Sequence, residues 1–327
     1  MNKPRPVIIG SHILHNYVTR VRAAFGRLET AHGATHRGWN AEKSLSYIQE
    51  VFDDYLAYGG LSRDDLAGKT VLEIGPGDNL GVAMEFLAAG AARVIAVEKF
   101  RPTRDPAQER QIYLTLRERH TASERARLDD AVDLSSEIRL NPERLCCLTG
   151  LGIEDTGSTV AAGSIDLLIS RAVLMEFPDS ELAFRSMDRL LRPGGRSFHK
   201  IAPLHDYQMF RANGYHPLEF LTVPDALYQP MVSDSGKPNR RLLSYYRDVM
   251  RRMNYRAEFH VVRVLGSTRK YPPATWTDGI DEETRRQAAG MIATIRPRLL
   301  ERYQALDDAD LMTEDFFLVA QRPGGTL

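Results

Sequence analysis

The chain has 327 residues, of which 43% are hydrophobic and 26% are charged, and its 43 lysines and arginines balance its 43 aspartates and glutamates. This profile is typical of a folded globular protein with a sizeable core and excludes an intrinsically disordered chain. The balanced charge gives no electrostatic reason to expect nucleic acid or an acidic membrane as the main partner.

Two further features of the sequence concern the cellular setting. Cys146 and Cys147 are adjacent, a spacing that rarely forms a disulfide, so we expect a reducing, cytoplasmic environment. No stretch approaches the ~20 apolar residues of a membrane span, and Gly10, Ser11 and His12 interrupt the N-terminal apolar run before a signal-peptide core could form. The oligomeric state stays open, a homodimer included.

Taken in chain order, the first predicted elements are helices, and strands begin near residue 69. The apolar spacing at i, i+3 and i+4 is clearest in the second helix. The expected elements are helices at 12–28 and 41–58, a strand at 70–74, a helix at 80–90 and a strand at 93–98.

Strands and helices continue to alternate over the rest of the chain, apart from a proline-punctuated stretch. The expected elements are an Arg-rich helical segment at 104–128, strands at 144–150, 164–170 and 195–201, helices at 179–191, 242–253 and 282–305, and strands at 257–264 and 315–321. This alternation predicts a doubly wound, seven-stranded, mostly parallel α/β sheet of Rossmann-like type, with the last strand inserted beside its neighbours. We divide the chain into an N-terminal helical extension or lid at 1–68 and a domain at 69–327, with a substrate-side insertion at about 202–240.

A glycine-rich turn follows the first strand in the stretch VLEIGPGDNLG (71–81). A strand that leads through such a turn into a helix bares backbone N–H groups at a helix N-terminus, and Gly75 and Gly77 let a ligand come close. Glu98 ends the next strand, where a doubly wound sheet presents a carboxylate to ribose hydroxyls. Nicotinamide cofactors and S-adenosylmethionine both fit this outline. Glu73 separates them, because an acid before the glycines would repel a pyrophosphate but suits a cationic methionine moiety.

Four stretches resemble successive motifs of the class I S-adenosylmethionine-dependent methyltransferases: LEIGPGDNLG, VIAVEK, SIDLLISRAVLMEF and RLLRPGGRSF. They cover about 130 residues in the expected order. The resemblance implies S-adenosylmethionine as the cofactor, and it implies that the acidic-x-Gly-x-Gly motif is formed by Glu73, Gly75 and Gly77. Asn79 stands where the family often has a third glycine; Asn can adopt a left-handed conformation and can offer its amide to the ligand.

The same resemblance assigns further cofactor-binding positions along the sheet edge. Glu98 matches the ribose-binding acid, and Ile153 and Glu154 lie in the loop that flanks the adenine in the family. The full set of predicted cofactor-binding residues is Glu73, Gly75, Gly77, Asn79, Leu80, Glu98, Lys99, Ile153, Glu154, Ser170 and Arg171. Arg171 could instead belong to a surface ion pair.

Candidate catalytic groups follow the fifth strand. A hydroxyl acceptor benefits from a base, whereas a neutral amine needs mainly orientation. The stretch FHKIAPLHDYQMF supplies His199, His205 and Asp206, and His205 is the preferred base because it lies where the sheet edge opens. His199 lies inside the strand, where a packed core residue is the alternative. Together with His216 these groups match no metal-ligand spacing, so we expect no metal.

We therefore expect a methyltransferase that modifies an oxygen of a small polar or carbohydrate-containing (glycan) acceptor. Nucleic acid is not favoured: the Arg-rich helix near residues 240–256 is more typical of a solvated face, and SRAV replaces the Asn/Asp-Pro-Pro-aromatic motif of nucleobase amino methylases. Three alternatives stay open, namely N-methylation of a small molecule, a noncatalytic S-adenosylmethionine-binding partner protein, and a nicotinamide oxidoreductase.

Overall fold

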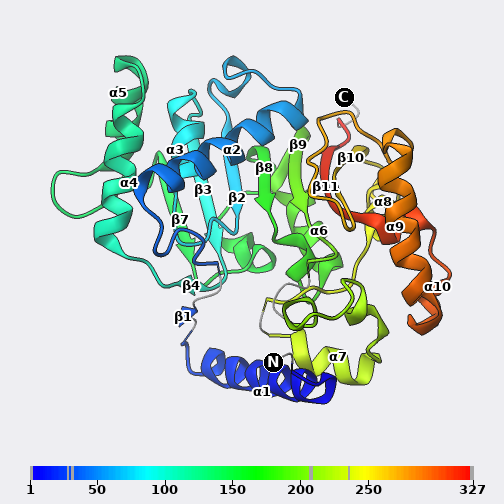
Figure 1. Cartoon of the computed structure of the whole chain (residues 1–327). Helices are drawn as coiled ribbons and strands as arrows, with labels where there is room; N and C mark the ends of the chain where they lie inside the picture. Colours follow the sequence, from blue (N-terminus) through cyan, green and yellow to red (C-terminus); the bar gives the residue numbers. More distant parts are fainter. Residues whose placement is uncertain (1–2, 28, 31–32, 206–208, 235, 325–327) are drawn as a thin grey trace. The chain divides into compact units, whose positions relative to one another are not determined.

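A seven-stranded sheet organises the fold in the computed structural model, which describes residues 3–27, 29–30, 33–205, 209–234 and 236–324 (Figure 1). In spatial order its strands are β10, β11, β9, β8, β2, β3 and β7. The last strand of the chain, β11, lies between β9 and β10, and the predicted doubly wound, mostly parallel fold is confirmed. The strands are β2 (Thr70–Ile74), β3 (Arg93–Glu98), β7 (Leu145–Thr149), β8 (Ile165–Arg171), β9 (Leu191–Ile201), β10 (Arg256–Val264) and β11 (Thr313–Gln321).

The chain divides into two compact units. The glycine-loop unit comprises Leu28–Arg171, Glu181–Phe198 and Val319–Leu327. The insertion unit comprises Met1–Arg27, Ala172–Ser180 and His199–Leu318. This grouping joins residues 28–68 to the glycine loop, and the division at residue 68 stays a prediction.

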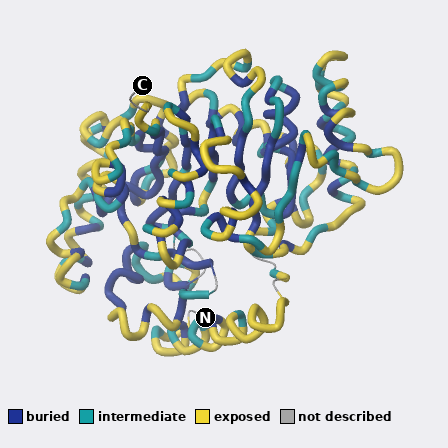
Figure 2. Tube along the Cα trace, turned by 180° about the vertical axis from the view of Figure 1, so that it is seen from behind, coloured by how far each residue is buried: buried dark blue, intermediate teal, exposed yellow. Residues whose placement is uncertain are grey.

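Four parallel strands form the core of the glycine-loop unit. Val71 pairs with Val94 on one side and with Leu167 on the other, and Val94 pairs with Leu145. These side chains are at most 5% exposed, as expected for parallel strands covered on both faces (Figure 2). Because the strands share one direction, their carboxyl ends meet at one edge of the sheet.

Helices α2 (Ala41–Gly59), α3 (Gly81–Ala88), α4 (Pro106–Glu118) and α5 (Ala122–Ala131) pack on one another in this unit (Figure 1). The prediction of one helical segment over 104–128 was wrong, because two helices occupy it. The Asp105 side chain caps the first, and Thr121 and Glu124 form a capping box that starts the second. The sequence TASE (121–124) is typical of such a capping box.

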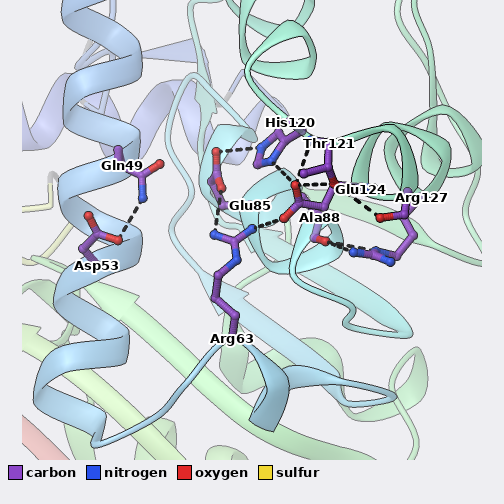
Figure 3. A network of polar contacts seen from close by, with 10 residues as sticks. Gln49, Asp53, Arg63, Glu85, Ala88, His120, Thr121, Glu124 and Arg127 are labelled. Atoms are coloured by element: carbon purple, nitrogen blue, oxygen red, sulfur yellow. Dashed lines mark hydrogen bonds and ion pairs between the residues drawn. The ribbon is translucent and has the colours of Figure 1, made fainter.

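A polar cluster connects α3 and α5 around the buried carboxylate of Glu85, with Arg63 and His120 contributed by connecting segments (Figure 3). His120 Nε2 lies 3.2 Å from Glu85 Oε1, and His120 Nδ1 lies 3.4 Å from Glu124 Oε2. Arg63 Nη2 lies 2.8 Å from Glu124 Oε1 and its Nη1 lies 3.9 Å from Glu85 Oε2. The two cationic groups offset the cost of burying a carboxylate on α3, the helix that follows the glycine loop.

The insertion unit has its own core, formed mainly by large apolar side chains such as Phe210, Phe220, Tyr228 and Met231. Helix α1 packs on α7, and Ile8 reaches this core. The stretch at 202–240 therefore contains a helix as well as irregular backbone. Its helices are α1 (Arg5–Ala24), α7 (Asp225–Val232), α8 (Leu243–Arg252), α9 (Glu282–Ile295), α10 (Glu301–Gln304) and α11 (Asp308–Met312).

Two predicted helix boundaries were also wrong. The first helix begins at Arg5 rather than near residue 12, because Pro4 precedes it and Gly10 and Ser11 do not interrupt it. The helix predicted at 282–305 ends at Ile295, since Pro297 lies in a 3₁₀ turn that separates α9 from α10.

None of the described helices is long and apolar enough to cross a membrane. The remaining elements are α6 (Ser180–Leu190) and the short strand pairs β1 (Glu29–Thr30) with β4 (Arg101–Pro102) and β5 (Val132–Asp133) with β6 (Arg139–Leu140).

Candidate cofactor site

The glycine loop connects β2 to α3 and takes a conformation that favours glycine at two positions. Gly75 and Gly77 have φ values of 71° and 72°. A Cβ on Gly77 would lie 2.6 Å from the carbonyl oxygen of Gly33, and a Cβ on Gly81 would lie 2.3 Å from Ile48 Cδ1 on α2. Gly77 thus lets another backbone segment lie against the loop, and Gly81 permits close packing of α3 on α2.

Glu73 is the last acidic residue before the loop, and the residue is 6% exposed. Its Oε2 is buried with no hydrogen-bond partner among the described residues. Burial, followed by the negative charge of Glu98, raises the pKa of Glu73 to about 8. A buried carboxyl group with an unsatisfied oxygen fits a cationic ligand, which would supply the missing partner.

Glu98 ends β3 and holds the glycine loop against it. Its Oε2 accepts a hydrogen bond from Gly77 N at 3.1 Å, and its Oε1 accepts one from Phe100 N at 3.1 Å. Each carboxylate oxygen has a second lone pair, so Glu98 can still accept from the two hydroxyls of a ribose.

Asn79 and Leu80 close the loop at the start of α3. Asn79 Oδ1 accepts from Gly81 N at 2.7 Å, while its Nδ2 is buried and has no partner in the described part of the chain. Asn79 is not among the non-glycine residues with positive φ, so it does not use the left-handed conformation considered from the sequence. Leu80 N donates to the hydroxyl of Tyr113 on α4 at 2.7 Å. Asn79 therefore presents a free amide donor, whereas Leu80 is held by the protein.

Lys99, Ile153 and Glu154 come together beyond β3 and β7. Lys99 Nζ lies 2.8 Å from Glu154 Oε1, Ile153 is 1% exposed, and Glu154 Oε2 has no partner among the described residues. The link to Glu98 is direct, because Gly150 N donates to the carbonyl oxygen of Glu98 at 2.7 Å. The loop after β7 is thus fixed beside the end of β3.

Ser170 and Arg171 end β8, next to β2. Ser170 is fully buried. Arg171 Nη1 lies 2.8 Å from Asp54 Oδ2 and its Nη2 lies 3.7 Å from Glu50 Oε1, both on α2. Ala172 follows with φ 56°, a conformation that is strained for a residue with a side chain. In this structure Arg171 makes an ion pair, but its side chain is 15% exposed and so does not lie on the surface as the alternative from the sequence had it. Its contacts fix α2 relative to the end of β8.

A segment that the sequence did not single out, residues 33–39, lies against the glycine loop. Asp78 N donates to Gly33 O at 3.2 Å, and His36 N donates to Asp78 Oδ2 at 3.0 Å. Arg104 Nη2 donates to Gly77 O at 3.2 Å. These contacts join parts of the chain that are far apart in sequence, so no local sequence pattern predicts them.

The segment and the loop enclose a cavity of about 340 Å³. His36 is 7% exposed, and its Nδ1 has no partner among the described residues. Its ring lies edge-on to Trp39 and Tyr47, with centroids 5.7 and 5.6 Å away. The cavity walls also include Asp78, Asn79, Arg104 and Glu109. His36 and Asn79, each with one buried polar atom that has no partner among the described residues, thus both line one cavity beside the loop.

The candidate catalytic residues belong to the insertion unit. His199, on β9, is 1% exposed, and burial lowers its pKa to about 3, as expected for a core histidine. His205 follows β9, and burial lowers its pKa to about 4, with the charges of Asp315, Lys200, Arg263 and Arg211 as smaller influences. Asp206 lies outside the described residues. No group of three or more potential metal ligands occurs in the part of the chain that the structure describes.

This strand order, with a glycine loop between two acids at the ends of adjacent strands, defines a nucleoside-binding α/β fold of the class I methyltransferase type. The family described as "Methyltransferase domain" matches residues 132–198 of the chain. The matched residues include β7 and β8 and do not include the glycine loop. A comparison with curated proteins found no match.

Several solved structures are similar to this chain at low sequence identity. Phosphoethanolamine N-methyltransferase 2 of Haemonchus contortus, in complex with S-adenosyl-L-methionine, is 14% identical, with 85% of this chain and 52% of that protein covered and a TM-score of 0.41. An S-adenosylmethionine-dependent methyltransferase of Mesorhizobium loti is 12% identical, with coverages of 84% and 96% and a TM-score of 0.40. The chain thus spans about half the length of the Haemonchus protein.

Proposed function

We propose that this methyltransferase transfers the methyl group of S-adenosylmethionine to an oxygen of a small polar or carbohydrate-containing acceptor, in a reducing, cytoplasmic setting. The observation that carries the cofactor assignment is the buried carboxyl of Glu73, whose Oε2 lacks a partner among the described residues. A cationic methionine moiety would satisfy it, whereas a pyrophosphate would be repelled.

The cofactor-binding residues have distinct proposed roles. When bound, S-adenosylmethionine supplies an electrophilic methyl group on its sulfonium sulfur. Glu98 accepts the ribose hydroxyls, and Glu73 stabilises the positive charge. The buried Nδ2 of Asn79 donates to an acceptor atom of the ligand, and Ile153 packs against the adenine. Lys99 and Glu154 form a paired polar rim, and Ser170 and Arg171 border the methionine end.

We assign His205 the role of general base on the acceptor. Because its pKa is lowered to about 4, its imidazole is neutral at pH 7 and can accept a proton. An attacking hydroxyl would lose its proton as the new carbon–oxygen bond forms and the methyl carbon–sulfur bond breaks, with its electron pair left on the neutral thioether sulfur. The proton would pass to His205 and then to solvent. We assign His199 a packing role on account of its burial in β9.

One observation favours the N-methylation alternative. A pKa near 4 makes His205 a weak base, and a neutral amine nucleophile needs orientation rather than proton removal before attack. The two hypotheses differ in the atom that receives the methyl group, so the product decides between them.

The test uses the full chain, methyl-labelled S-adenosylmethionine and pairs of small acceptors that differ only by a hydroxyl or an amine on the same skeleton, including sugars and amino sugars. Mass spectrometry of the products locates the label. Label on the hydroxyl members is expected. Label confined to the amines would replace the proposal with N-methylation. Cofactor binding without any labelled product, also in extracts of the source cell, would favour a noncatalytic role.

A further inference from the structure

Helix α1 has two apolar faces, and one of them is used within the insertion unit. Ile8 is 1% exposed and belongs to the core of this unit, and the partly buried Ile9 and Ile13 pack against that core. Asn16 is 2% exposed and its side chain bonds Ser233, just after α7. At 100° per residue these side chains share one side of the helix.

The opposite face of α1 carries a second apolar stripe that is exposed. The large apolar residues at positions 7, 14, 18, 21 and 25 follow spacings of seven, four, three and four, which place them in one row along the helix. Their exposed fractions are 52% for Val7, 64% for Leu14, 38% for Val18, 39% for Val21 and 79% for Phe25. Figure 2 shows this helix coloured largely as exposed.

The stripe is unusual within this protein. Nine large apolar side chains are exposed in the described part of the chain, and six of them lie at positions 7–25, because Tyr17 flanks the five above. Single exposed apolar residues are ordinary, but a contiguous row marks a binding surface.

The charged side chains of the N-terminal segment itself have one sign. Residues 1–28 contain five lysines and arginines and no aspartate or glutamate, a bias hidden by the zero net charge of the whole chain. Arg5 pairs with Glu219 and Arg20 with Asp234, both in the insertion unit. Arg22 and Arg27 are exposed and take part in no ion pair among the described residues. The surface therefore combines an apolar row with uncompensated positive charge.

We propose that the exposed face of α1 binds the surface of a bilayer that contains anionic lipid, with the helix lying in the plane of the interface. A basic amphipathic helix buries its apolar row at the boundary of headgroups and acyl chains while its cations attract anionic headgroups. The exposed Phe25 and Tyr17 suit this boundary, since their rings are apolar and the tyrosine also has a polar end. A second copy of the chain is a poorer occupant, because pairing two such helices brings like charges together with no acid in either segment to offset them.

The test is sedimentation of the full chain with vesicles of phosphatidylcholine alone or mixed with phosphatidylserine. We expect about tenfold or more stronger binding to the anionic vesicles, weakened by added salt. Leu14→Asp with Phe25→Asp should abolish binding, and Arg22→Gln with Arg27→Gln should reduce it severalfold. Leu182→Asp, on α6, and Arg256→Gln, at the start of β10, are the matched controls and should bind like the wild type.

Three outcomes would overturn the proposal. They are equal binding to both vesicle types, wild-type binding by the α1 variants, and concentration-dependent self-association in ultracentrifugation that Leu14→Asp abolishes. The last would assign the stripe to a second copy of the chain. Circular dichroism checks that the variants fold, as expected for exposed positions. Binding is measured without a methyl acceptor, so its failure leaves the proposed methyl transfer unaffected.

Discussion

Glu98 raises the proton affinity of Glu73: the two acids lie at the ends of adjacent parallel strands, and the charge of Glu98 adds to burial in raising the pKa of Glu73 to about 8. Without a ligand, Glu73 is therefore mostly protonated at pH 7. A bound cation favours the carboxylate, so binding should lower that pKa and release a proton. Binding of the cofactor should thus be coupled to deprotonation of Glu73.

The affinity for S-adenosylmethionine should consequently rise with pH up to about 8, the pKa of Glu73. Calorimetry in buffers of different ionisation heat should detect proton release at pH 7. Glu73→Gln should bind more weakly and release fewer protons, and comparing it with the wild type removes the contribution of the ligand's own amino group. S-adenosylhomocysteine, which lacks the sulfonium charge, should show a smaller effect. Equal proton release by the wild type and Glu73→Gln would refute the role of Glu73.

Glu98→Gln should weaken cofactor binding by about tenfold or more, because an amide cannot accept from Gly77 N, Phe100 N and two ribose hydroxyls as a carboxylate can. The same change removes a negative charge near Glu73, so the pH midpoint for the affinity should move below 8. The shifted midpoint distinguishes this electrostatic coupling from a simple loss of binding. Glu137→Gln, at an exposed position, is the control and should change neither quantity.

His205→Ala should lower kcat about 10²-fold or more on a hydroxyl acceptor, with little change in the dissociation constant of S-adenosylmethionine. The reason is that the loss of a base slows the chemical step without touching the cofactor residues. His15→Ala, on the exposed part of α1, is the control for removing a histidine. Near-normal turnover by His205→Ala would remove the base from the mechanism and favour an amine acceptor.

The parts of this site that could be predicted from the sequence are those that depend on local patterns. The strands at 70–74 and 93–98 were predicted with the bounds that the structure has, because each is a short apolar run closed by turn residues. Strand order then brings Glu73 and Glu98 to one edge. The approach of Gly33 to Gly77 was not predicted, since backbone contacts between residues far apart leave no periodic signal. The pairing of Arg171 with Asp54 likewise depends on where α2 docks.

His120 should make stability depend on pH. Its hydrogen bond to Glu85 is the main cause that raises its pKa above 6.5, aided by the charges of Glu85 and Glu124 and opposed by burial. A raised pKa means that the stabilisation is fully present below pH 6.5 and is lost as the pH rises through the folded-state pKa. Denaturant unfolding should show that His120→Gln costs roughly 1–2 kcal/mol at acidic pH and much less at alkaline pH. A cost independent of pH would show that the charge of His120 is unimportant.

Gly77→Ala should be more damaging than Gly68→Ala, although both glycines have nearly the same φ, 72° and 71°. Either substitution should lower the free energy of unfolding by about 1–2 kcal/mol, because alanine disfavours a left-handed backbone. At Gly68 the added Cβ meets nothing within 4 Å, whereas at Gly77 it lies 2.6 Å from Gly33 O. Only Gly77→Ala must therefore displace the segment at 33–39, and it should also weaken S-adenosylmethionine binding. Calorimetry and thermal unfolding of both variants measure the difference; equal losses would mean that the Gly33 contact contributes nothing beyond backbone strain.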